Sequence, residues 1–211
     1  MPLYKTITVN STTKVLIWKI IESFDMLSEG ILLTPHCRER VDRMKSDLHQ
    51  RGFMSVRHLL AAMGYTDFDL YYDVLGKPHL KDGKKISITH SYTFSAIIVS
   101  DHEVGIDIEM QRPKILKIAQ KFTPIEEYRT LANEDALIRK LTMVWGAKES
   151  IYKSFAEPGV SFIKNIYVED FDMEVMETTA QVSYKGKEEN YQVWFEEFEG
   201  FTGAYAIISE K

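Results

Sequence analysis

Short stretches in which apolar and polar residues alternate recur along the chain, and this period of two is typical of strands that bury one face. Residues 4–21 begin with such an alternation and continue as an apolar run, which is compatible with a strand and with a short helix. Turn residues separate the later stretches from one another. The later strands are predicted at residues 86–90, 94–99, 104–109, 162–168, 174–184, 191–198 and 201–208.

Helical spacing of apolar residues is found in the first half of the chain. Thr34 and Pro35 are typical of a helix N-cap that is followed by proline at the first helical position. They predict a polar helix that reaches about Gln50 and is interrupted by Gly52. A second helical piece is expected at residues 54–63.

The second half contains a longer helical pattern. Asn133 is the candidate N-cap of a helix that runs from about Glu134 to Phe155. Upstream of it, Pro113 opens a shorter helix, and Thr123-Pro124-Ile125-Glu126 is a capping box. Together with the strands, these helices predict an α+β protein with mostly antiparallel sheets.

Length and composition fit a folded protein that stays in solution. The chain has 211 residues, of which 45% are hydrophobic and 27% charged, enough for one large domain or two small lobes. No apolar stretch approaches the ~20 residues of a membrane-spanning helix. The N-terminus has no apolar signal core, and the single cysteine, Cys37, cannot form an internal disulfide. A cytoplasmic protein without a membrane anchor is therefore expected.

The net charge and its distribution along the chain indicate which classes of ligand each half is suited to bind. A net charge of −5 argues against a large basic face that binds nucleic acid. The acidic excess lies in the second half, whereas all six histidines lie in the first half. An anionic ligand is therefore expected to meet the first half, and a divalent cation the second.

The stretch Gly105-Ile106-Asp107-Ile108-Glu109 carries the clearest candidate chemistry. On a strand, Asp107 and Glu109 point to the same face, while Ile106 and Ile108 point to the other. Two neighbouring carboxylates repel each other unless a cation lies between them, and their oxygens are suitable ligands for Mg²⁺. The alternative is a solvated strand face at the edge of a sheet.

A second candidate lies on the long helix. Glu149 and Lys153 are four positions apart and share one flank of it. They are either an ordinary ion pair between successive turns or part of a site. Lys148 falls in the middle of the apolar stripe, where an unpaired cation is costly, so its ammonium is expected to reach solvent or an anion.

A third candidate is Thr89-His90-Ser91 at a strand end, where hydroxyls and an imidazole can hold a phosphate. A purely structural histidine is the alternative.

The motifs of serine hydrolases, P-loop proteins and dinucleotide-binding folds are absent from the sequence. One cysteine and no paired histidine motif argue against zinc.

In combination, the motifs resemble the 4′-phosphopantetheinyl transferases of the long, surfactin-synthetase-activating type. The resemblance covers roughly residues 76–155. It rests on the order of four motifs, Gly76-Lys77-Pro78-His79-Leu80, Ile88-Thr89-His90-Ser91, Gly105-Ile106-Asp107-Ile108-Glu109 and Trp145-Gly146-Ala147-Lys148-Glu149-Ser150-Ile151-Tyr152-Lys153.

The resemblance implies a Mg²⁺-dependent enzyme that transfers 4′-phosphopantetheine from coenzyme A to a serine of an apo acyl or peptidyl carrier protein and releases 3′,5′-ADP. It also implies a monomeric pseudo-dimer of two similar α+β lobes with coenzyme A in the cleft between them. The N-terminal lobe, residues 1–104, would bind the coenzyme A phosphates and adenine. The C-terminal lobe, residues 105–211, would carry the metal ligands and the catalytic helix.

The resemblance also assigns roles to individual residues. The implied metal ligands are Asp107, Glu109 and Glu149. Implied catalytic residues are Glu149, Lys153 and His90, with Glu149 or a metal-bound water as the base for the carrier serine. The implied coenzyme A contacts are Arg43, Arg57, Lys77, Thr89, His90, Lys148 and Lys153.

The sequence departs from the family pattern in the N-terminal half. Thr89 stands where serine is usual, and Tyr71-Tyr72-Asp73 stands where many members carry an arginine. The 3′-phosphate contact is then expected from Arg40, Arg43 or His36. Two alternatives to the transferase are a non-catalytic module that binds coenzyme A or a carrier protein, and a different Mg²⁺-dependent phosphotransferase or nuclease.

Overall fold

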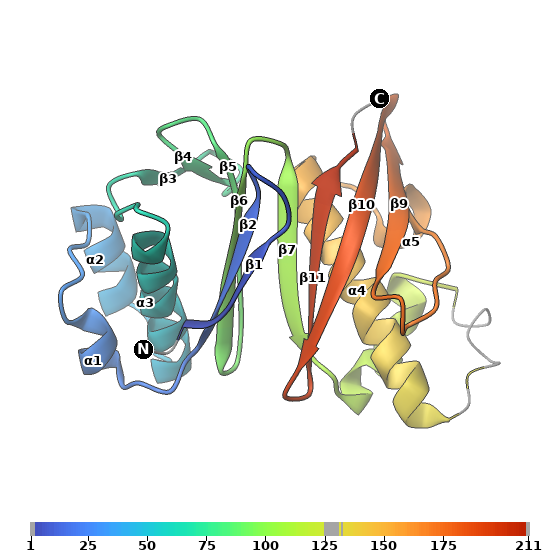
Figure 1. Ribbon diagram of the computed structural model, residues 1–211, viewed down its shortest axis with the longest axis horizontal. Helices are drawn as coiled ribbons and strands as arrows, with labels where there is room; N and C mark the ends of the chain where they lie inside the picture. The colour runs from blue at the N-terminus through green and yellow to red at the C-terminus, as the bar shows by residue number, and fades with distance from the viewer. Residues whose placement is uncertain (1–2, 125–130, 132, 210–211) are drawn as a thin grey trace. The chain divides into compact units, whose positions relative to one another are not determined.

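The chain folds into two compact units, Met1–Asp101 and His102–Lys211, each with its own antiparallel sheet and helices (Figure 1). This computed structural model describes residues 3–124, 131 and 133–209. The α+β class with mostly antiparallel sheets is confirmed. None of the helices in the described part of the chain is long and apolar enough to span a membrane.

The N-terminal unit is a six-stranded sheet with three helices on one side (Figure 1). Along the sheet the strands are ordered β1-β2-β6-β5-β4-β3, so residues 4–21 contribute two strands. The strands are β1 (Leu3–Thr8), β2 (Lys14–Lys19), β3 (Leu70–Tyr72), β4 (Pro78–Leu80), β5 (Lys85–Ser91) and β6 (Phe94–Ser100). The helices are α1 (Phe24–Ser28), α2 (Pro35–Asp42) and α3 (Asp47–Ala62).

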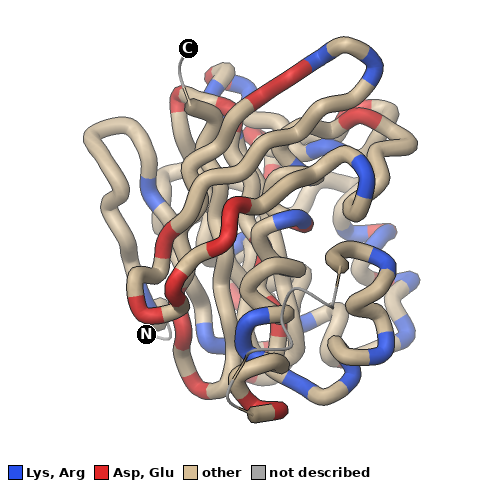
Figure 2. Tube along the Cα trace, turned by 90° about the vertical axis from the view of Figure 1, so that its right-hand side faces the viewer, with Lys and Arg blue, Asp and Glu red and all other residues tan. Residues whose placement is uncertain are grey.

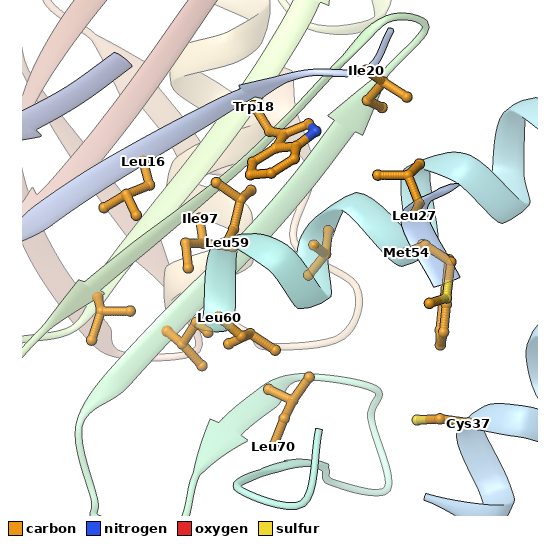
Figure 3. Close-up of a cluster of buried hydrophobic side chains, with 14 of the residues drawn as sticks. Leu16, Trp18, Ile20, Leu27, Cys37, Met54, Leu59, Leu60, Leu70 and Ile97 are labelled. Atoms are coloured by element: carbon orange, nitrogen blue, oxygen red, sulfur yellow. The ribbon is translucent and has the colours of Figure 1, made fainter. Parts of the chain in front are cut away.

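Packing of α3 against the sheet forms the core of this unit. Figure 3 shows Leu16 and Trp18 of β2 and Ile97 of β6 on the side that faces Leu59 and Leu60 of α3. All of these side chains are buried. Burial of each such side chain stabilises the fold by roughly 1.5–3 kcal/mol.

The predicted helix break at Gly52 is wrong. The chain leaves the helical path after α2 and begins α3 at Asp47, where the side chain of Ser46 accepts a hydrogen bond from the backbone N–H of His49. Gly52 lies inside α3, although glycine in a helix interior costs about 1 kcal/mol relative to alanine. A Cβ at this position would lie 3.3 Å from Cγ of His90, so the glycine allows the imidazole to pack on the helix.

The C-terminal unit is a five-stranded sheet in the order β7-β11-β10-β9-β8 with a long helix, α4 (Glu134–Phe155), against it (Figure 1). The strands are β7 (Val104–Met110), β8 (Ile166–Val168), β9 (Glu177–Tyr184), β10 (Lys187–Phe198) and β11 (Phe201–Ile208). Between β7 and α4, the described residues form two 3-10 turns, η1 (Pro113–Lys117) and η2 (Ala119–Lys121). A short helix, α5 (Phe162–Asn165), precedes β8.

Of three local predictions for this unit, the cap of α4 is confirmed and two others hold only in part. Asn133 caps α4 as expected, with its Oδ1 accepting the backbone N–H of Ala136 at 2.9 Å. The predicted helix at Pro113 is instead the pair of 3-10 turns, and the predicted strand at residues 162–168 begins with α5. Residues 125 and 126 of the predicted capping box lie outside the described residues.

Helix α4 packs unusually close to β7. A Cβ at Gly105 would lie 1.7 Å from the carbonyl oxygen of Ser150 in α4, a distance that no side chain tolerates. Gly146 of α4 is also near the sheet, since a Cβ there would lie 3.1 Å from Cβ of Ala204 in β11. The two glycines therefore let the backbone of the helix approach the sheet directly.

Substitution of Gly105 by alanine is predicted to destabilise the C-terminal unit by about 1–3 kcal/mol or more, because the methyl group would overlap backbone atoms that cannot rotate away. Urea unfolding of the full chain, followed by circular dichroism, measures this. Gly203→Ala in β11 is the matched control, since its Cβ would make contacts no closer than 3.6 Å. Equal unfolding midpoints for the two variants would contradict the close packing.

Candidate functional site

Strand β7 and helix α4 bring the predicted acidic residues of the second half together. Asp107 is buried at 5% exposure, whereas Glu109 on the same strand face is half-buried. Ile106 and Ile108 are buried on the opposite face, as the alternation predicts. Glu149 is not near these residues in the sequence, and the packing of α4 on β7 supplies its proximity.

Lys153 joins the helix to the strand. Its ammonium donates to Oδ1 of Asp107 at 2.7 Å and to the carbonyl oxygen of Ile106 at 3.0 Å. The structure thus pairs Lys153 with Asp107 on β7 rather than with Glu149 on its own helix. The side chain of Lys153 is still 29% exposed, so the cation is accessible from solvent.

The three carboxyl groups repel one another. Burial raises the pKa of Glu149 to about 7, and the charges of Asp107 and Glu109 add to the rise, although Lys153 opposes it. Burial and the charge of Asp107 also raise the pKa of Glu109, against the effect of a hydrogen bond from Trp145. Negative charge is therefore concentrated where β7 meets α4, and a cation would relieve the repulsion.

The donor chemistry of this acidic set fits Mg²⁺, which prefers carboxylate oxygens and commonly takes only one or two from the protein. Among residues 3–124, 131 and 133–209, no three or more His, Cys, Asp or Glu side chains are grouped closely enough to hold a metal ion. Asp107 is engaged by Lys153 and Glu109 by Trp145. Magnesium at this place therefore stays a prediction, supported by the kind of donors and by their mutual repulsion.

Trp145 contacts the acidic set, although the sequence assigned it no role beyond being the first residue of its motif on α4. Its indole N–H donates to Oε1 of Glu109 at 3.2 Å. A cavity of about 170 Å³ lies beside this pair, lined among others by Arg112, Ile115 and Ile118. The signal for this role was weak, because a tryptophan at helical spacing is as typical of a core as of a site.

The ammonium of Lys148 does not reach solvent, which was one of the two outcomes expected for it. The side chain is buried at 5% exposure, and its ammonium donates to backbone carbonyl oxygens of Phe122, Phe162 and Ile166 at 2.7–2.8 Å. An ammonium has three N–H donors, so several backbone carbonyls can accept from it at once. The predicted contact of Lys148 with a coenzyme A phosphate stays a prediction.

Arg57 also lies in a different environment from the one predicted. It is 3% exposed and its Nε donates to Oδ1 of Asp67 at 2.9 Å. Its other nitrogens donate to the carbonyl oxygen of Phe53 and to Sγ of Cys37. The guanidinium is thus a buried cross-link of the N-terminal unit, which conflicts with the predicted contact to coenzyme A.

Arg43 and the predicted phosphate-binding residues of β5 differ in exposure. Arg43 is exposed and forms an ion pair with Glu39 on the preceding helical turn. Thr89 is buried at 6% exposure, whereas the next residue, His90, is exposed. His90 packs on Gly52, and its ring centroid lies 6.2 Å from that of His49.

Lys77 lies in a turn that Asp73 organises. Oδ1 of Asp73 accepts the backbone N–H groups of Leu75 and Lys77, each at 2.9 Å. Its Oδ2 lies 3.0 Å from Nε2 of His79. Asp73 belongs to the Tyr71-Tyr72-Asp73 stretch, where many members of the resembled family carry an arginine. In this chain it shapes the Gly76-Lys77-Pro78 turn instead.

Comparison with known proteins bears on the second half most directly. Residues 103–208, half of the chain, match the family model described as the 4′-phosphopantetheinyl transferase superfamily. Over 131 residues the chain is 28% identical to "4′-phosphopantetheinyl transferase gsp" of Aneurinibacillus migulanus. The match covers 60% of this chain and 52% of that protein, so it spans about half the length of the relative.

The buried Arg57–Asp67 pair predicts a pH-dependent stability. Burial alone would raise the pKa of Asp67, but hydrogen bonds from Thr34 and the charge of Arg57 together lower it. This carboxylate therefore stabilises the fold above the ordinary carboxyl range, and the stabilisation is lost as the pH falls through the lowered pKa. Asp67→Asn is expected to cost about 3–5 kcal/mol at pH 7 and progressively less under acidic conditions.

Urea unfolding of the original chain and of Asp67→Asn at several pH values measures how the difference in the free energy of unfolding depends on pH. The exposed pair Arg43–Glu39 provides the control, since Glu39→Gln is expected to cost no more than about 1 kcal/mol. A cost for Asp67→Asn that matches the control at pH 7 would show that the buried pair is not a structural cross-link.

Proposed function

This chain belongs to the 4′-phosphopantetheinyl transferase superfamily, and we propose that it transfers the 4′-phosphopantetheine group of coenzyme A to a serine of an apo carrier protein. The proposal rests on one observation, the proximity of Asp107, Glu109 and Glu149 to Lys153 where β7 packs on α4. These four residues lie within the half of the chain that matches the family. We expect the enzyme to act as a monomer in the cytoplasm.

The reaction breaks a phosphoanhydride bond of coenzyme A and forms a phosphoester bond to the carrier serine. The serine oxygen of the carrier forms a bond to the β-phosphorus of coenzyme A, and the bond from that phosphorus to the bridging oxygen breaks. The pair of electrons stays on the bridging oxygen, and 3′,5′-ADP leaves. Catalysis of such a transfer depends mainly on positioning and on neutralisation of charge.

Asp107, Glu109 and Glu149 would hold the magnesium ion in this proposal. When bound, Mg²⁺ supplies neutralisation of the pyrophosphate charge and orientation of the attacking and leaving oxygens. Carboxylates that already repel one another suit this role, because a divalent cation lowers the energy of the set as a whole. Glu149 accepts the proton of the carrier serine, directly or through a water molecule.

Lys153 contributes a second positive charge. Its ammonium is fixed to Asp107 and to the carbonyl oxygen of Ile106, so its position is set before substrate arrives. Because the side chain is partly exposed, it can contact a phosphate oxygen and stabilise the negative charge that develops on the leaving group. A preorganised cation of this kind requires little rearrangement during the reaction.

Residues of the N-terminal unit contact coenzyme A in the proposal. The backbone of Lys77 is held in its turn by Asp73, and His90 is exposed at the end of β5. Both side chains are proposed to contact phosphate oxygens. Thr89 precedes His90 on β5 and is buried. Arg43 is exposed and can exchange its surface partner for a phosphate.

The carrier protein is proposed to approach the connection between β7 and α4. The basic residues of this connection are Arg112, Lys114, Lys117 and Lys121, and residues 110–124 contain no acidic residue (Figure 2). The C-terminal half is otherwise acidic. A carrier with acidic residues around its target serine would be attracted to this stretch, next to the cavity beside Glu109 and Trp145.

Intact-mass spectrometry of an apo carrier protein tests the function. We predict that incubation with the full chain, coenzyme A and Mg²⁺ adds one phosphopantetheine to the carrier, and that a chelator prevents the addition. No addition to fatty-acid, polyketide or peptidyl carriers, despite binding of coenzyme A, would replace the transferase with a binding module.

Asp107→Asn is predicted to lower kcat/KM by at least about 100-fold, because it removes the buried negative charge that the cation and Lys153 share. The amide has the same shape as the carboxylate, so the circular dichroism spectrum should be unchanged. Glu177→Gln, at an exposed position of β9, is the matched loss of one carboxylate in the same unit and should retain the activity of the original chain. Equal activities of the two variants would remove Asp107 from the site.

A further inference from the structure

Lys148 is a buried cation on the face of α4 that packs against the rest of the C-terminal unit. A charge moved from water into such a place costs several kcal/mol unless it is fully hydrogen-bonded. The ammonium donates to the carbonyl oxygens of Phe122 at 2.7 Å, Phe162 at 2.8 Å and Ile166 at 2.7 Å. One side chain thus fixes the backbone at the end of η2, in α5 and at the start of β8.

Two of these carbonyls belong to the phenylalanines whose rings enclose Trp145. The Phe122 ring meets the indole edge-on, with centroids 5.1 Å apart, and the Phe162 ring lies tilted against it at 5.3 Å. Trp145 is three positions before Lys148 and therefore on the same face of α4. The ammonium consequently holds the backbone of both residues that set the orientation of the indole.

The orientation of the indole determines where its N–H points. That N–H donates to Oε1 of Glu109 at 3.2 Å, and hydrogen bonds weaken steeply when their angle departs from linearity. Glu109 is one of the three mutually repelling carboxyl groups of the site. A continuous set of contacts therefore runs from Lys148 through the two phenylalanines and Trp145 to Glu109.

We propose that Lys148 is a positioning residue, which sets the place of the Glu109 carboxylate through Phe122, Phe162 and the Trp145 indole. The effect on catalysis rests on the proposed function. The physical link itself is a property of the C-terminal unit and can be measured without any substrate.

The indole N–H signal of Trp145 in a ¹H–¹⁵N spectrum of the full chain reports on this link. The chain has three tryptophans, and Trp145→Phe identifies the signal. We expect Lys148→Met, which keeps the length of the side chain and removes its charge, to shift the Trp145 signal while Trp18 and Trp194 keep theirs. A Trp145 signal unchanged by Lys148→Met would overturn the proposal.

Lys140→Met is the matched control, because Lys140 is also a buried lysine of α4 at 3% exposure. Its ammonium lies 3.4 Å over the ring of Phe171, which stacks on Phe195 rather than on the tryptophan. The Trp145 signal should stay in place in this variant. A shift as large as that of Lys148→Met would show that loss of any buried lysine disturbs the indole.

If Lys148→Met does not fold, Phe162→Leu is a second variant that can still contradict the proposal. This variant retains the carbonyl that Lys148 binds and removes only the ring that packs on Trp145. The Trp145 signal should again shift, and no shift would exclude the proposed route. The buried cation is undisturbed in this variant, so its fold should be retained.

Activity provides the second readout. Lys148→Met should lower kcat/KM by about 2- to 30-fold, the range of couplings carried through packed side chains, whereas Lys140→Met should not. If the original chain modifies no carrier, the proposed function fails, while the indole signal still decides the link. If the original chain is active and Lys148→Met is equally active, the positioning role is refuted.

Discussion

The contact between Gly105 of β7 and the backbone of Ser150 in α4 is the constraint on which the candidate site depends. A Cβ at Gly105 would lie 1.7 Å from the carbonyl oxygen of Ser150, so the two elements meet at backbone distance. At this separation Lys153 reaches both Asp107 and the carbonyl of Ile106 across the interface. A larger residue at position 105 would move the helix outward and separate the carboxyl groups that now repel one another.

Buried cations organise both units, and each one is matched by oxygen atoms. Arg57 pairs with Asp67 in the N-terminal unit, while Lys148 is held by three backbone carbonyls in the C-terminal unit. Removal of a partner from such a group leaves a charge in a medium that solvates it poorly and is therefore expected to destabilise the fold. Lys153 combines a fixed position with partial exposure, and this combination suits contact with a phosphate.

Much of the fold could be predicted from local patterns. Alternation identified β5 and β7, an apolar stretch identified β6, and Asn133 marked the start of α4, because these features depend on neighbours in the sequence. The break at Gly52 was mispredicted, since the glycine serves a contact with His90, a residue distant in the sequence.

The candidate site was predictable to a smaller extent. The spacing of Asp107 and Glu109 placed both on one face, and the family resemblance added Glu149 and Lys153. The partners of Lys148 and Arg57 were not predicted, because they are carbonyl, carboxylate and thiol groups that no local pattern reveals. Trp145 was missed as a partner of Glu109 for the same reason.

The most direct test of the account locates the cation itself. Crystals of the full chain grown with Mn²⁺, which takes oxygen ligands as Mg²⁺ does and scatters X-rays anomalously, would show the metal as an anomalous difference peak. The account predicts a peak in contact with the carboxylates of Asp107 and Glu149 between β7 and α4. A peak elsewhere, with these carboxylates free of metal, would contradict it.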